Sequence, residues 1–243
     1  MNIRCVWEHN GSDTIIFSDN FIGAFARGAS KEQALSKMHD EVISYLHWTG
    51  DPVPSALTTE IVQEKQSDLN IREADSDVIF DSERKPLTAA EYTGMKSLCL
   101  KSAQDFLLLY GSVPDKDKSC LPKRTAFYGD VPRTAREMYD HTKNVNSYYF
   151  GEIGVKADNG GDILQCRERG FALLEGDPDF LENKVYLGSY NEEWSLRKLL
   201  RRFIWHDRIH AKAMYRMAAK TFGSCPDTFY FGNDCFNGER SSL

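Results

Sequence analysis

The sequence predicts a protein of two parts: a small α+β module with a linker at residues 1–82, and an all-α four-helix bundle with a C-terminal tail at residues 83–243. Short β-prone segments separated by turn residues precede residue 66. Four amphipathic helical patterns joined by polar connections follow from residue 88. The charge also changes, because residues 1–82 carry 6 Lys+Arg and 14 Asp+Glu, a net −8, whereas the remainder carries 24 and 22, a net +2.

The first part is predicted to have the element order βββαβ. Asn10-Gly11 and Asp19-Asn20 are turn sequences that favour a three-strand meander. A helix can follow because Ser30 is a good N-cap, and the two prolines of residues 51–54 end it. The expected elements are strands at residues 3–7, 14–17 and 21–26, a helix from Ser30 to about Trp48, and a strand at residues 58–64.

Residues 17–35 contain a strand, a turn with Gly28 and Ser30, and a helix start with Ala34, and Tyr45-Leu46 follow. This arrangement resembles the HicB-like antitoxin fold over about the first 65 residues. A module of this kind can bind a protein partner through a sheet edge.

The second part begins after residues 66–87, whose few apolar groups and many charges are typical of a linker, with a boundary near Ser82. Capping-box sequences at residues 88–91 and 134–137 mark two helix starts. The expected helices run from residue 88 to about 110, 134 to about 151, 163 to 174, and about 195 to 222. The connection at residues 111–131 is long enough to be a crossover or a lid.

Histidines occupy positions on two of these helices where apolar residues are expected. His206 and His210 lie on the apolar stripe of the last helix, and His141 lies on that of the helix at 134–151. An i, i+4 pair places two imidazoles on one face, and a facing helix can add the third metal ligand. Three neutral ligands leave a coordination position open, as in catalytic sites. The alternative is that each histidine is a hydrogen-bonded residue of the core.

Residues 194–210, which end in Trp205-His206-Asp207-Arg208-Ile209-His210, and residues 136–142 resemble the DinB-like superfamily. The resemblance covers nearly all of residues 83–222. It implies a four-helix bundle of up-down-down-up topology in which His141, His206 and His210 hold a divalent metal ion, nickel or zinc. The superfamily includes low-molecular-weight thiol S-transferases and a mycothiol-dependent isomerase. A homodimer is also compatible with the resemblance, because DinB-like bundles often pair.

Several further residues are candidates for supporting roles. Glu137 and Asn144 lie one turn either side of His141 and could orient it, although Glu137 also fits the capping box. Asp207 is expected to be a surface charge because it points about 100° away from His206. Tyr148 and Tyr215 could line the pocket or fill the core, and the core is favoured.

Four cations form a basic ridge on the last helix: Arg201, Arg208, Lys212 and Arg216. The ridge can be a solvated face or the docking surface of the acidic residues 1–82. DNA binding is disfavoured because the net charge is −6 and no DNA-binding motif is present.

Composition and motifs exclude other classes. No serine-nucleophile elbow, phosphate-binding glycine loop or H-E-x-x-H sequence is present. No apolar run is long enough for a signal peptide core or a membrane span, so we expect a cytoplasmic protein with reduced cysteines. A Cys225–Cys235 disulfide is a minor alternative, and aromatic residues in the tail at 223–238 are expected to pack on the bundle, where they could close over the metal site.

Two functions remain open. The first is a metal-dependent enzyme that transfers a low-molecular-weight thiol or hydrolyses a small-molecule substrate; no general base is evident, so the catalytic residues are unassigned. The second is a non-catalytic stress-response or protein-interaction protein stabilised by the metal. A fourth protein ligand would favour the second function, and an open site would favour the first.

Overall fold

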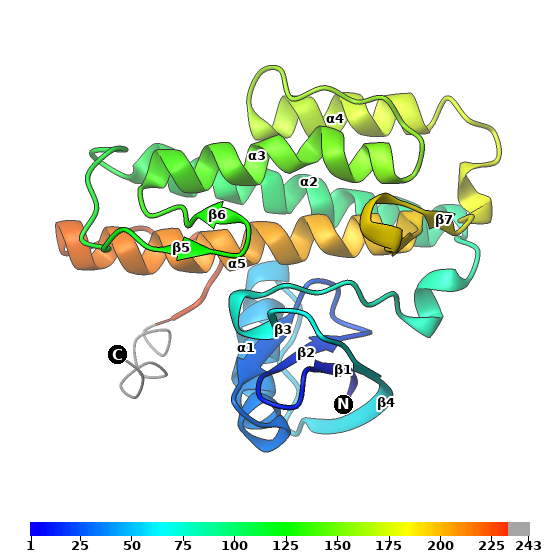
Figure 1. Ribbon diagram of the computed structural model, residues 1–243, viewed down its shortest axis with the longest axis horizontal. Helices are drawn as coiled ribbons and strands as arrows, with labels where there is room; N and C mark the ends of the chain where they lie inside the picture. Colours follow the sequence, from blue (N-terminus) through cyan, green and yellow to red (C-terminus); the bar gives the residue numbers. More distant parts are fainter. Residues whose placement is uncertain (233–243) are drawn as a thin grey trace.

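The long helix α5 lies between two layers of structure in the computed structural model, which describes residues 1–232 (Figure 1). One layer is a sheet with helix α1, and the other contains helices α2, α3 and α4. The main elements are β1 (Asn2–His9), β2 (Thr14–Ser18), β3 (Phe25–Gly28), α1 (Lys31–Thr49), β4 (Thr58–Gln66), α2 (Ala89–Ser112), α3 (Ala135–Glu152), α4 (Ile163–Leu174) and α5 (Leu196–Phe222).

The sheet has the strand order β3-β2-β1-β4. β2 pairs antiparallel with β1 and β3, whereas β1 and β4 are parallel because α1 carries the chain back across the sheet. α1 begins where the Ser30 side chain accepts a hydrogen bond from the Gln33 N–H, and it ends at Gly50, whose left-handed backbone closes the last turn. Both faces of the sheet are covered, so every residue of β2 is buried.

The third strand starts later than the sequence indicates, at Phe25 and not at Phe21. The Ser18 hydroxyl accepts a hydrogen bond from the Phe21 N–H and holds a turn before the strand. Gly23 has a φ of 90°, and a Cβ placed there would lie 2.4 Å from Ile204 Cγ2 of α5. This glycine is therefore required both by its backbone conformation and by close contact with α5.

Residues 67–88, which we call the strap, are packed along the structure although their composition is typical of a linker. The strap contains two short 3₁₀ helices, η1 (Ile71–Glu73) and η2 (Asp81–Arg84). Its residues Ile71, Val78 and Phe80 are buried against the sheet and Trp205 of α5. The strap therefore joins the second face of the sheet to α5.

The predicted fold class, an α+β module followed by an all-α four-helix bundle of up-down-down-up topology, is wrong. Residues 1–232 form an α+β structure with a four-stranded sheet and five α-helices, and α2 to α5 are not a clear four-helix bundle. The physical reason is the burial of α5, because its outer side is covered by the strap, the sheet and α1. Two short strand pairs also interrupt the helical part: β5 (Thr125–Ala126) with β6 (Gly129–Asp130), and β7 (Tyr186–Leu187) with β8 (Glu193–Trp194).

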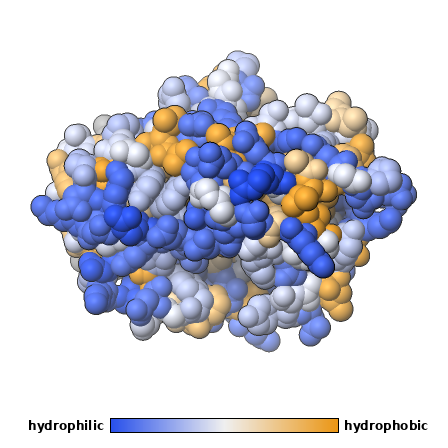
Figure 2. All heavy atoms as spheres, turned by 90° about the horizontal axis from the view of Figure 1, so that it is seen from above, coloured by the Kyte–Doolittle hydropathy of each residue, from blue (hydrophilic) through white to orange (hydrophobic). Residues whose placement is uncertain are grey.

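The helix positions themselves agree with the sequence pattern. Both predicted capping boxes are present, with Thr88 and Glu91 at the start of α2 and Thr134 and Glu137 at the start of α3. α5 packs mainly on α2 and α3, and α4 packs on the same two helices from the other side. The outer face on the α4 side is mostly hydrophilic, with small separate apolar patches (Figure 2).

The basic ridge on α5 is a docking surface for the N-terminal part. Arg208 and Lys212 each donate to the Glu41 carboxylate of α1, with N···O distances of 2.8 Å. Arg201 forms an ion pair with Glu83 of the strap. The prediction that the ridge receives the acidic residues 1–82 is therefore confirmed for Arg208 and Lys212.

The tail packs on α1 and α5 as far as it is described. Phe229 is buried and stacks on Trp48, with ring centroids 5.3 Å apart, and Phe231 lies beside Tyr215. Phe231 also lies beneath the Arg208 and Lys212 side chains, so this part of the tail packs on the face of α5 that pairs with Glu41 of α1. Phe236 and the predicted Cys225–Cys235 pairing lie outside the described residues.

None of the described helices is both long and apolar enough to cross a lipid bilayer.

The first prediction concerns the buried ion pair between Arg167 of α4 and Asp207 of α5, which are both fully buried. Asp207→Asn leaves the guanidinium without its anion, so we expect a loss of about 3–5 kcal/mol in the free energy of unfolding, measured by urea denaturation in EDTA. Asp117→Asn, which breaks an exposed pair with Arg136, is the matched control and should change little. Equal effects of the two substitutions would contradict this assignment.

The second prediction concerns Glu8, which is fully buried on β1 and accepts a hydrogen bond from the Ser76 hydroxyl of the strap. Burial raises the pKa of Glu8 from 4.5 to about 7, so folding favours the protonated carboxyl. The free energy of unfolding therefore decreases as the pH rises from 4.5, the ordinary pKa of a glutamate, to about 7, the pKa of Glu8 in the folded chain. We expect Glu8→Gln to be more stable than wild type by up to about 3 kcal/mol at about pH 8, and nearly equal at about pH 4.

Urea denaturation across this pH range measures the difference. Glu60→Gln, at an exposed position of β4, is the control and should not show a gain that grows with pH. A difference between Glu8→Gln and wild type that is independent of pH would contradict the prediction.

Candidate metal centre

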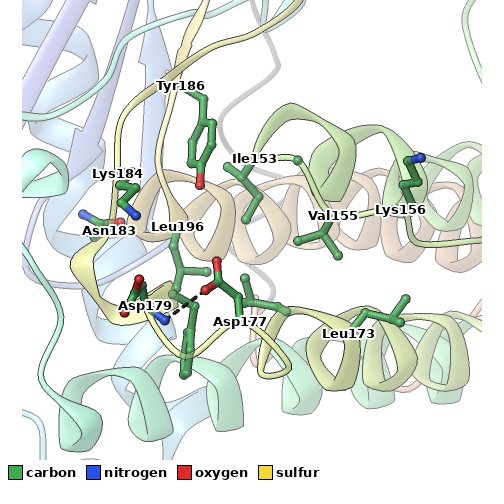
Figure 3. Close-up of a pocket in the computed structure, with 13 residues that line it drawn as sticks. Ile153, Val155, Lys156, Leu173, Asp177, Asp179, Asn183, Lys184, Tyr186 and Leu196 are labelled. Atoms are coloured by element: carbon green, nitrogen blue, oxygen red, sulfur yellow. Dashed lines mark hydrogen bonds between the residues drawn. The ribbon is translucent and has the colours of Figure 1, made fainter.

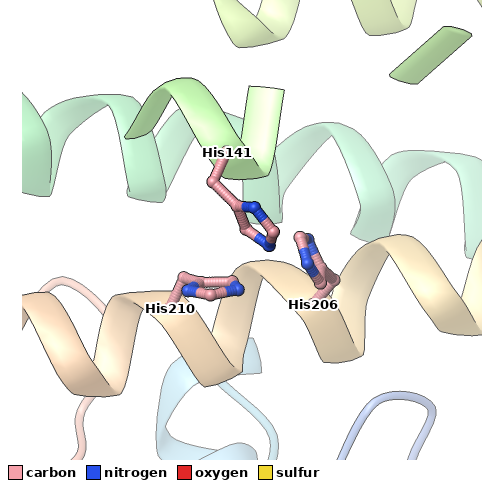
Figure 4. Close-up of side chains that lie close together, drawn as sticks. All are labelled: His141, His206 and His210. Atoms are coloured by element: carbon pink, nitrogen blue, oxygen red, sulfur yellow. The ribbon is translucent and has the colours of Figure 1, made fainter. Parts of the chain in front are cut away.

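The structure brings the three predicted histidines together between α3 and α5 (Figure 4). His141 extends from α3 toward His206 and His210, which are one turn apart on α5. One candidate ligand atom from each ring lies within 4.8 Å of the others. The ring centroids of His206 and His210 are 4.5 Å apart. The centroid of His141 lies 5.2 Å from that of His206 and 4.7 Å from that of His210. Such a group could hold one metal ion.

Packing on both helices positions the imidazoles. α3 and α5 begin at capped residues, Thr134 and Ser195, and pack against each other along their length. The Tyr149 ring of α3 makes an edge contact with His206, with centroids 6.0 Å apart, and also packs on Phe203. The site therefore has a rigid aromatic wall on the side of the N-terminal half of α5.

The electrostatic environment keeps the imidazoles neutral. Burial lowers the pKa of His206 well below 6.5, and the neighbouring His210 and His141 lower it further. Burial and His141 lower the pKa of His210 to about 3, and burial also lowers that of His141. A neutral imidazole has a lone pair, which metal binding requires.

An orphaned nitrogen provides an independent test of whether the residues fit a metal. His206 is only 8% exposed, and its buried Nδ1 has no hydrogen-bond partner among the described residues. Buried polar atoms are rarely left unpaired because the loss of hydration is not compensated. A cation bound at the cluster is a simple explanation for such a nitrogen, so the donor set fits a metal ion.

The cluster contains three residues, and no cysteine or carboxylate of residues 1–232 joins it. Structural zinc sites are almost always closed by four protein ligands, whereas catalytic sites keep a position for water or substrate. The described part of the chain therefore offers an open donor set.

Some of the predicted supporting roles are wrong. Asp207 is fully buried in the pair with Arg167, because the direction about 100° from His206 faces α2 and α4 and not solvent. Glu137 Oε2 accepts from the Arg133 and Thr134 N–H groups, so Glu137 is a helix cap. Tyr148 is 38% exposed and is not a core residue, whereas Tyr215 is buried as predicted. The backbone carbonyl of Asn144 accepts a hydrogen bond from the Asn159 side chain.

Two residues near the site were not found by sequence reasoning. Tyr128, at the tip of the β5–β6 hairpin, lies beside His141 with ring centroids 6.3 Å apart. Arg27 of β3 is close enough for its charge to lower the pKa of His210. The sequence contains one signal for Tyr128, which is the long connection at residues 111–131, predicted to be a crossover or a lid. It contains none for Arg27.

A separate cavity of about 460 Å³ opens at the other end of α5, near Leu196 (Figure 3). It is lined by apolar side chains, including Ile153 and Val155, and by charged ones, including Asp177 and Lys184. Leu196 and His206 are ten positions apart on one helix, which corresponds to about 15 Å. This cavity is therefore distinct from the histidine cluster.

No protein-family model, curated protein or solved structure matches this chain.

The third prediction concerns metal binding by the cluster. After incubation with zinc or nickel and removal of the excess, we expect about one ion per chain by elemental mass spectrometry, and little in His141→Ala, His206→Ala or His210→Ala. His39→Ala, which removes an exposed histidine of α1, is the matched control and should bind as wild type does. Retention of the ion by all three variants would exclude the cluster as the binding site.

Proposed function

We propose that this chain is a divalent-metal-dependent enzyme that acts on a small-molecule substrate at the three-histidine cluster. The observation that carries the proposal is the convergence of three neutral imidazoles with no fourth histidine, cysteine or carboxylate from residues 1–232. In this donor set His141, His206 and His210 would hold the ion. The ion would supply an acidic position that lowers the pKa of a coordinated water or thiol.

The identity of the metal and the reaction class rest on the resemblance to the DinB-like superfamily. This resemblance concerns the helix segments that carry the histidines, residues 136–142 and 194–210. It supports nickel or zinc as the metal, and transfer of a low-molecular-weight thiol or hydrolysis as the reaction. The proposal places this activity in the cytoplasm, where such thiols remain reduced.

The chain's own residues supply positioning and exclusion of water. The Tyr149 ring, which packs on Phe203, covers one side of His206 with aromatic surface. Tyr128 stands near His141, and burial raises the pKa of its hydroxyl, which stays protonated as a hydrogen-bond donor. A substrate bound between Tyr128 and the histidines would find one hydrogen-bond donor, the Tyr128 hydroxyl, and one aromatic surface, the Tyr149 ring.

The open donor set also separates this proposal from its rival, a non-catalytic stress-response or protein-interaction protein stabilised by a metal. A purely structural ion is normally enclosed by four protein ligands. Residues 1–232 offer three ligands, and the proposal assigns the remaining coordination position to a substrate.

The fourth prediction tests this open position. Cobalt(II) can replace zinc as a visible probe, and a thiolate that coordinates it adds a charge-transfer absorption band. We expect mercaptopropanol to produce this band in cobalt-loaded wild type and in His39→Ala, and not in His210→Ala. A cobalt-loaded protein whose spectrum does not respond to the thiol would have a closed site and would support the non-catalytic alternative.

A further inference from the structure

The tip of the β5–β6 hairpin borders the histidine cluster. Phe127 and Tyr128 form this tip and are 55% and 46% exposed. Their rings contact each other, and the Tyr128 ring lies 6.3 Å from that of His141. The hairpin is thus the part of the helical layer that a substrate would meet beside the cluster.

The N-terminal part of the chain is attached to this same border through η1 of the strap. The Phe127 N–H donates to Glu73 Oε2 at 3.2 Å, which ties the hairpin to the strap. The Arg27 Nη1 of β3 donates to the Arg72 carbonyl at 3.0 Å, which ties the sheet to the same turn. These two bonds hold Arg27 of the sheet and the tip of the hairpin, which carries Tyr128, to the same short helix η1.

The charges at this border favour an anion. Arg27 and Arg124 lie close enough for their positive charges to act at Tyr128, and the charge of Arg27 also reaches His210. Glu73 opposes these cations, although its carboxylate is engaged by the Phe127 N–H. The cluster itself contributes only neutral ligands, so a bound divalent ion would add two uncompensated positive charges. This positive region lies in a chain whose net charge is −6.

We propose that Arg27 and Tyr128 form the anion-recognition side of the histidine site, and that its substrate is a small molecule with a carboxylate next to the group that reaches the cluster. The inference rests on the proposed function and names its substrate class. A carboxylate suits these partners because a guanidinium and a phenolic hydroxyl both donate to its oxygens. Arg27 and Tyr128 are therefore specificity residues, and the N-terminal sheet supplies part of the substrate site.

The fifth prediction compares two thiols that differ in the carboxylate, mercaptopropionate and mercaptopropanol. Each is titrated into the cobalt-loaded full chain, and its dissociation constant is taken from the charge-transfer band. Arg27→Gln should weaken mercaptopropionate binding about tenfold and leave mercaptopropanol binding unchanged, because it removes one charge-assisted interaction. Arg27→Lys should restore part of the loss, and Tyr128→Phe should weaken mercaptopropionate about threefold.

Arg4→Gln, on β1 of the same sheet and paired with Asp19, is the control and should affect neither thiol. The cobalt spectrum without thiol and the melting temperature show whether each variant keeps its site and its fold. If Arg27→Gln weakens both thiols equally, or weakens neither, the specificity assignment is overturned while the metal site stands. If wild type binds no cobalt, the proposed function fails and the inference fails with it.

Discussion

The burial of positive charge along α5 is the constraint on which the rest of the structure depends. Lys198, Arg201, Arg202 and Arg208 are each at most 8% exposed. A buried cation is tolerated only when an anion or several carbonyl groups replace its hydration. Most of these partners come from the strap and from α1. The N-terminal part therefore supplies the groups that neutralise the cations buried on α5.

The partners are distributed along the helix in order. Near its start, Lys198 donates to the Asp77 carbonyl of the strap and to Glu192. Arg201 pairs with Glu83 and also lies over the Phe80 ring, 3.9 Å from its centroid. Further along, Arg208 reaches Glu41 of α1. A guanidinium can be buried in this way because its planar faces pack on aromatic rings while its edge donates hydrogen bonds.

This arrangement also accounts for the geometry of the histidine cluster. α5 is held by the strap and α1 on one side and by α2 and α3 on the other, so His206 and His210 face α3 in one fixed orientation. The Arg167–Asp207 pair holds a further side of the same helix turn. Through η1, the strap that neutralises α5 also positions Arg27 and the hairpin at the open side of the cluster. The attachment of the two parts and the shape of the site therefore have a common physical basis.

The sequence by itself determined the local features: the helix positions, the capping boxes of α2 and α3, the positions of most strands of the four-stranded sheet, and the three histidines on apolar stripes. These follow from periodicity and short-range hydrogen bonds, which a sequence displays directly. Only the tertiary structure decided that α5 is covered on its charged side, that Asp207 is buried, and that Arg27 and Tyr128 border the cluster. The reason is that a long cation or a carboxylate looks the same in a sequence whether it faces water or a distant partner. Its burial depends on a counter-charge such as Glu41, which lies 167 positions from Arg208 in the chain.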